Sequence, residues 1–162
     1  ILFLCDTPGF MVGPDIEARA QVRHVSRLFV VGASLTVPFA TIVVRKGYGL
    51  GAQAMAGGSF KAPVFCVAWP TGEVGGMGLE GAVRLGFRRE LEAVDDPAAR
   101  DQLFADMVDR AYANGQALNS ATHFELDDVI DPADSRRWIH TAFASWSPPN
   151  RATKKRPCID TW

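Results

Sequence analysis

The fold is decided by one stretch of the sequence, residues 39–56, which reads FATIVVRKGYGLGAQAMA. Its first part, residues 39–44, is apolar and mostly β-branched, which predicts a strand. Three glycines follow at alternate positions, Gly47, Gly49 and Gly51, and residues 52–56 then favour a helix. A strand, a glycine-rich turn and a helix in this order are typical of α/β proteins.

Strand-like runs occur on both sides of this stretch. Strands are expected at residues 1–5, 64–68 and 127–131. Residues 72–78 are expected to form a short strand or a loop. The run at residues 1–5 is apolar and followed by a turn, which is typical of a buried strand. Strands that alternate with helices predict an α/β architecture with at least partly parallel strands.

Helical periodicity predicts the connections. Ala18, Val22, Val25 and Phe29 recur at spacings of four, three and four, and they predict one helix from about residue 15. Further helices are expected at residues 80–85 and 103–111. The charged residues 89–102 are expected to form a solvated helix or a surface excursion. The segment from residue 147 is rich in Pro, Lys and Arg and is expected to be extended.

The last helix has a clear start signal. Asp131 suits the N-cap position and Pro132 the first helical position. The apolar residues that follow predict its buried face, and they are Trp138, Ile139, Ala142 and Phe143.

Composition narrows the class of protein. The chain has 162 residues, of which 48% are hydrophobic, and 17 basic against 18 acidic residues give a net charge of −1. This balance gives no electrostatic reason to expect nucleic acid or a membrane as a partner. No apolar run approaches the roughly 18 residues that would span a bilayer. The chain begins on a strand without Met, so we expect a fragment of a longer polypeptide.

The cysteines and histidines show no spacing typical of a metal site. Cys5 and Cys66 lie in apolar runs and are expected to be buried, reduced thiols. His24, His123 and His140 have no partner at metal-ligand spacing, so each is expected to be a surface or packing residue.

Two turn motifs invite a functional interpretation. Asp6-Thr7-Pro8-Gly9 after an apolar strand resembles a GTPase tetrapeptide, but no phosphate-binding loop or base-recognition motif accompanies it. A tight turn is the better explanation. The glycines of residues 47–51 leave free N–H groups at the start of a helix, where they could bind a phosphate or stabilise an oxyanion. A strand-to-helix crossover without a ligand explains the same spacing equally well.

Several collinear blocks of the sequence resemble a known family, the carboxyltransferase (beta) subunits of biotin-dependent acyl-CoA carboxylases. These blocks are residues 6–13, 22–24, 37–38, 44–49, 68–71, 77–82, 127–136 and 155–162. The resemblance implies a crotonase-like (ClpP/crotonase) α/β fold built from repeated ββα units. It also implies that residues 1–162 are the C-terminal, biotin-side domain of a two-domain subunit.

In this family, the first domain of one subunit and the second domain of another enclose the active site. The resemblance therefore implies a homo-oligomer, often a hexamer, with a biotin carboxylase and biotin carrier as partners. It implies the cytoplasm as the location, or the mitochondrial matrix in a eukaryote, and a role in fatty acid metabolism. No metal, nucleic acid or membrane is implied.

The resemblance also implies a reaction, the transfer of CO₂ from carboxybiotin to the α-carbon of an acyl-CoA. The family is thought to use backbone amides as donors to the ureido and thioester oxygens, and no side-chain base. The ureido-side donors correspond to the amides of Leu50 and Gly51. The flanking Tyr48, Gly49 and Ala52 then bind biotin, and Gln53 corresponds to a position that is tied to the choice of acyl chain.

Three positions depart from the family pattern. Gly47 stands where Ala is usual, Leu50 where Gly or Ala is usual, and Gln53 where similar propionyl-CoA carboxylases carry Asp. The last difference argues against a preference for propionyl-CoA. Two alternatives remain open: a non-catalytic assembly fragment, and a crotonase relative that decarboxylates acyl-CoA.

Overall fold

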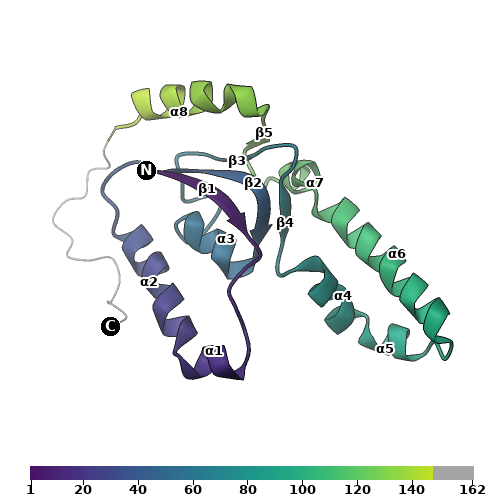
Figure 1. Ribbon diagram of the computed structural model, residues 1–162. Coiled ribbons are helices and arrows are strands. Elements are labelled where there is room, and N and C mark those ends of the chain that lie inside the picture. Colours follow the sequence, from purple (N-terminus) through teal and green to yellow (C-terminus); the bar gives the residue numbers. More distant parts are fainter. Residues whose placement is uncertain (148–162) are drawn as a thin grey trace.

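The stretch FATIVVRKGYGLGAQAMA forms the central strand β2 (Ala40–Tyr48) and the helix α3 (Gly49–Met55). The predicted strand and helix are confirmed, but no separate turn lies between them, because β2 continues through Gly47 and α3 begins at Gly49. The computed structural model describes residues 1–147. Among them, β2 lies in the middle of a five-stranded parallel sheet with helices against both faces (Figure 1). The other strands are β1 (Leu2–Thr7), β3 (Cys66–Ala68), β4 (Glu73–Gly75) and β5 (Asp128–Val129).

Three strands pair with β2. β1 lies along one edge of β2, with Leu2 opposite Ala40. The other edge is shared, because β3 pairs with residues 41–43 and β4 with residues 46–48. β5 pairs with β3 and completes the order β1-β2-β3-β5. The end of β2 therefore lies between β1 and β4, which sets the position of α3.

Alternate residues of β2 are buried in two separate clusters. Val43 packs on the α3 side with Cys5, Cys66 and Ala52. Ile42 packs on the opposite side, where α8 (Ser135–Ala144) covers the sheet. Side chains of a strand point alternately to the two faces, so a strand covered on both sides has a continuous apolar run. This explains the composition of residues 40–44.

The helix predicted after residue 131 is confirmed. Its first turn is the 3₁₀ segment η1 (Pro132–Asp134), and the Asp131 carboxylate accepts a hydrogen bond from the Ala133 amide at 2.8 Å. The four residues predicted for the buried face pack against the α8-side cluster. Most of the predicted extended segment from residue 147 lies outside the described residues.

The prediction of one helix from about residue 15 is wrong in part. α1 (Pro14–Ala18) and α2 (Gln21–Ala33) are separate, because Ala20 has a left-handed conformation with φ 57°. The break turns the first residues of the predicted face outward, and Val22 is 73% exposed. Val25 and Phe29 are half-buried, and α2 packs against α3.

The prediction that the first strand is buried is also wrong in part. Among the described residues β1 is an edge strand, and within it only Cys5 is buried, while Leu2 and Leu4 are 37% and 55% exposed. Its apolar residues alternate between a covered and an uncovered face. An apolar run alone does not distinguish an edge strand from a central one.

The segment after β4 forms an arm that extends from the sheet (Figure 1). It contains α4 (Leu79–Gly86), α5 (Arg88–Glu92) and α6 (Pro97–Gly115), so the charged residues 89–102 are helical on both sides of a short break. α7 (Ala117–Thr122), which the sequence did not predict, returns the chain to the sheet. Within the described part of the chain, no helix is long and apolar enough to cross a membrane.

Candidate functional site

α3 begins with unpaired backbone donors. The first four N–H groups of any α-helix lack an intrahelical acceptor. No side chain caps this helix, and its N-cap, Tyr48, is extended. Gly49 has φ +58°, and a Cβ there would stand 2.9 Å from the Gly76 carbonyl oxygen. Only glycine lets the segment after β4 approach the start of α3 so closely.

The turn at Asp6–Gly9 supports the start of α3 from the other side. Two interactions hold Asp6: the Arg45 side chain donates hydrogen bonds at 2.9–3.2 Å, and the Lys46 amide donates at 3.1 Å. The bonds from Arg45 first, and from the Lys46 amide second, lower the pKa of the Asp6 carboxyl. Asp6 therefore fixes the turn to β2 just before the glycine stretch, in agreement with the structural interpretation of this motif.

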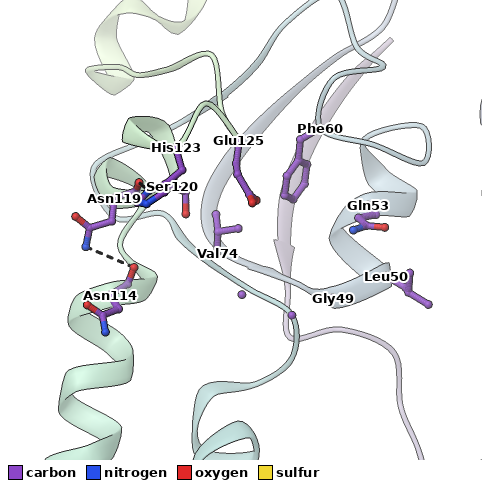
Figure 2. Close-up of a pocket in the computed structure, with 12 residues that line it drawn as sticks. Gly49, Leu50, Gln53, Phe60, Val74, Asn114, Asn119, Ser120, His123 and Glu125 are labelled. Carbon is purple, nitrogen blue, oxygen red and sulfur yellow. Dashed lines mark hydrogen bonds between the residues drawn. The ribbon is translucent and has the colours of Figure 1, made fainter.

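A cavity of about 730 Å³ opens beside the start of α3. Figure 2 shows its walls, which come from segments far apart in the sequence. The lining residues are Gly49, Leu50, Gln53, Phe60, Val74, Gly75, Gly76, Asn114, Asn119, Ser120, His123 and Glu125. The α3 side supplies backbone, Leu50 and Gln53. The opposite side is polar and comes from α6, α7 and the loop after it.

The polar wall carries side chains with unused hydrogen-bonding groups. Nδ1 of His123 lies 2.9 Å from the Asn119 carbonyl oxygen. A carbonyl only accepts, so Nδ1 holds the proton and Nε2 of the neutral ring remains an acceptor. The side chains of Gln53, Ser120 and Glu125 make no hydrogen bond or ion pair with any described residue. This wall can therefore hydrogen-bond a polar ligand.

Tyr48 lies beneath the site and not in it. Its ring is 2% exposed and its hydroxyl donates a hydrogen bond to the Glu73 carboxylate at 2.5 Å. Burial, and then this hydrogen bond, raise the pKa of the phenol above its usual value. The bond joins β2 to β4 below the cavity, so the Tyr48 hydroxyl has a structural role.

The structure places the predicted site residues in two groups. Gly49, Leu50 and Gln53 line the cavity, and the Leu50 side chain is 58% exposed. Tyr48, Gly51 and Ala52 are buried behind the wall. Gly51 would therefore reach a ligand through its backbone alone, whereas the Leu50 amide belongs to a residue of the wall.

Most residues of the opposite wall carry no signal in the sequence. Phe60, Ser120 and Glu125 lie in segments without a motif, and no local signal pointed to them. His123 was expected to be a surface or packing residue, and the structure shows it exposed on the cavity wall. Only the tertiary structure brings these residues to α3.

The buried cysteines and the absence of a metal-binding cluster among the described residues limit the chemistry of the site. Cys5 and Cys66 are fully buried, as expected, and burial raises the pKa of Cys5 to about 11 and that of Cys66 to about 12. Neither thiol is therefore an activated nucleophile at neutral pH. Residues 1–147 contain no group of three or more His, Cys, Asp or Glu side chains that could hold a metal ion.

Comparison with known proteins identifies the family. Residues 1–158 match the family model described as "Carboxyl transferase domain". The carboxyltransferase subunit of propionyl-CoA carboxylase from Haloferax mediterranei is 40% identical over 136 residues, which are 84% of this chain and 26% of that subunit. The chain thus spans about a quarter of the length of this relative.

Solved structures agree with this match. A single-chain, multi-domain long-chain acyl-CoA carboxylase is 64% identical, with a TM-score of 0.76, over 87% of this chain and 14% of that one. The transcarboxylase 12S hexamer with bound methylmalonyl-CoA is 33% identical, also with a TM-score of 0.76, over 97% of this chain and 31% of that one. The fold is therefore crotonase-like, and the chain belongs to the carboxyl transferase domain family.

Proposed function

We propose that residues 1–162 are the biotin-side, C-terminal domain of a two-domain subunit, and that this domain takes part in carboxyl transfer from carboxybiotin to the α-carbon of an acyl-CoA. One observation carries the proposal. The uncapped start of α3 lies at a cavity of about 730 Å³ whose opposite wall is polar. A small polar ring system such as the ureido group of biotin suits such a site.

The chain's own residues would serve this reaction through their backbone. When bound, biotin supplies the carboxyl group and a nitrogen base, while negative charge collects on its ureido oxygen. The amides of Leu50 and Gly51, in the first turn of α3, would donate hydrogen bonds to that oxygen, and the helix dipole would add to their attraction for the charge. Gly49 allows the backbone conformation at the start of α3, Ala52 packs in the core behind it, and buried Tyr48 bonds to Glu73 of β4.

We also propose a long acyl chain as the preferred acyl group. Support comes from the 64% identity to a structure described as a long-chain acyl-CoA carboxylase. Gln53 agrees with it, because a neutral amide beside an alkyl chain costs less than a carboxylate there. In the full subunit, a biotin carboxylase and a biotin carrier would supply the carboxyl group. Copies of the subunit would close the active site, as in a homo-oligomer such as a hexamer.

The experiment is carboxyl transfer to free biotin from malonyl-CoA, methylmalonyl-CoA, methylglutaconyl-CoA and a long-chain alkylmalonyl-CoA, with the full subunit that contains this chain. Leu50→Pro removes one amide donor, and proline is tolerated in the first turn of a helix. Leu50→Ala is the matched control, because it changes the same exposed side chain but keeps the amide. We expect Leu50→Pro to lower transfer about a hundredfold or more, and Leu50→Ala to retain most of it.

The outcomes separate the alternatives. Transfer that requires biotin and collapses only in Leu50→Pro supports the proposal. Turnover of the CoA esters without biotin would support a decarboxylase instead. A correctly folded full subunit without any turnover would overturn the enzymatic role and support an assembly function.

A further inference from the structure

Glu125 lies on the cavity wall, in the turn between α7 and β5, and its side chain is available to a ligand. Figure 2 shows its carboxylate directed into the cavity. Within residues 1–147 this carboxylate makes no hydrogen bond or ion pair. Lys61, which lines a smaller cavity together with Glu125, is paired with Asp127 at 3.0 Å instead. An ionised carboxylate only accepts hydrogen bonds, so Glu125 can receive an N–H donor from a bound molecule.

The backbone around Glu125 is held from both sides. The Glu125 amide donates a hydrogen bond to the Ser120 carbonyl at 3.1 Å, and the next residue, Leu126, is 2% exposed in the core. The Asp127 carboxylate then accepts a hydrogen bond from the Cys66 amide of β3 at 2.7 Å. The turn therefore keeps Glu125 on the wall opposite α3.

The two walls together complement a cyclic urea. The start of α3 offers N–H donors, and Glu125 offers an acceptor on the other side of the cavity. In carboxybiotin one ring nitrogen carries the carboxyl group, so the ureido group keeps a carbonyl oxygen and one N–H. These two groups point away from the ring in diverging directions, so their partners must come from different sides. A donor that leaves water without a new acceptor weakens binding.

We propose that Glu125 accepts a hydrogen bond from the remaining ureido N–H of carboxybiotin and thereby turns the ureido oxygen toward the amides of Leu50 and Gly51. The inference rests on the proposed carboxyl transfer and adds a residue that recognises biotin. The negative charge of Glu125 does not favour the anion that forms on the ureido oxygen. Glu125 should therefore lower KM for biotin and leave kcat nearly unchanged.

The test measures kcat and KM for free biotin with the full subunit and the CoA ester that the wild type prefers. It repeats both with an N-methylbiotin in which a methyl group replaces this N–H. We expect Glu125→Met, which keeps the length but removes the acceptor, to raise KM for biotin about tenfold. The preference for biotin over N-methylbiotin should fall by a similar factor, because only biotin has a hydrogen bond to lose.

Two variants serve as controls. Glu125→Gln keeps an acceptor oxygen and should retain most of the preference for biotin. Glu90→Met makes the same substitution at an exposed position of α5 that lines neither cavity, and it should change neither constant.

Three results would overturn the inference and leave the proposed function standing. The first is an unchanged preference for biotin over N-methylbiotin in Glu125→Met. The second is a higher KM for the CoA ester alone, which would assign Glu125 to the amide groups of CoA. The third is a lower kcat with unchanged KM, which would mean a contact within the protein. A folded wild-type subunit that shows no biotin-dependent transfer would overturn the proposed function as well.

Discussion

Gly51 lies directly against Gly9: a Cβ on Gly51 would stand 3.1 Å from the Cα of Gly9 and 3.2 Å from the Oγ1 of Thr7. Gly51 belongs to α3, and Gly9 to the turn that follows β1. The two turn motifs of the sequence are thus one structural unit, in which one backbone packs on the other. The start of α3 can lie this deep only because both positions lack a side chain.

Gly51→Ala should therefore move α3. The new methyl group meets backbone atoms that cannot rotate away, so we expect a loss of about 1–3 kcal/mol in the free energy of unfolding and a fall in carboxyl transfer. Urea denaturation of the full subunit measures the first. Gly86→Ala is the control, because a Cβ there meets nothing within 4 Å, and it should be neutral or slightly stabilising. Equal effects of the two variants would contradict the packing argument.

Gly49→Ala tests the backbone conformation instead of the packing space. A φ of +58° costs an alanine roughly 1–2 kcal/mol, and its Cβ would also approach the Gly76 oxygen at 2.9 Å. We expect a lower denaturation midpoint and weaker transfer to free biotin. Gly76→Ala changes the residue on the other side of this contact, where there is open space, and its midpoint should stay close to wild type. A stable Gly49→Ala variant would show that α3 can start differently.

Thr41→Val should loosen the end of α3. Thr41 is fully buried, and its hydroxyl donates a hydrogen bond to the Met55 carbonyl at 3.0 Å, which joins the last turn of α3 to β2. Removing the donor leaves the half-buried Met55 carbonyl without its protein partner, at a cost of about 1–3 kcal/mol. Thr36→Val, at an exposed position, should change the denaturation midpoint little. Indistinguishable midpoints would mean that water replaces the lost donor.

The raised pKa of Tyr48 predicts that the folded chain loses stability at alkaline pH. Burial first, and then the bond to Glu73, raise its pKa above the usual 10.0. The unfolded chain then loses this proton at a lower pH than the folded chain does. The contribution of Tyr48 to stability is therefore complete below about pH 10 and is lost as the pH rises further. Thermal melts between neutral and alkaline pH should show a shallower decline for Tyr48→Phe than for wild type.

Tyr112→Phe is the comparison for this prediction. A hydrogen bond to Glu80 raises the pKa of Tyr112 to about 12, but the pair lies nearer the surface, on the helical arm. The Tyr48 variant should lose more stability at neutral pH, since it leaves Glu73 without its donor below the cavity. A larger loss for Tyr112→Phe would mean that the arm, and not the floor of the site, is the more tightly held.

The sequence by itself determined the central unit. The β-branched residues before Arg45 favour a strand, and the glycines after it allow the chain to pass directly into a helix. Both preferences come from local steric effects. The cap at Asp131 and the apolar face of α8 were equally local, because each depends on residues within one or two turns. The resemblance of collinear blocks further specified the family and the crotonase-like fold. The roles of Leu50, Gly51 and Gln53 in the reaction remain predictions.

The tertiary structure alone decided the rest. No local pattern indicated that β1 lies at an edge of the sheet or that Ala20 divides a helix, because both features depend on the neighbouring elements. The cavity is the clearest case. Phe60 and Glu125 are far apart in sequence and come together only because β3 and β5 pair and α7 returns to the sheet. Short-range periodicity shows which face of a helix or strand is apolar. The wall of a binding site forms where several elements meet, and their arrangement in space is set only when the chain folds.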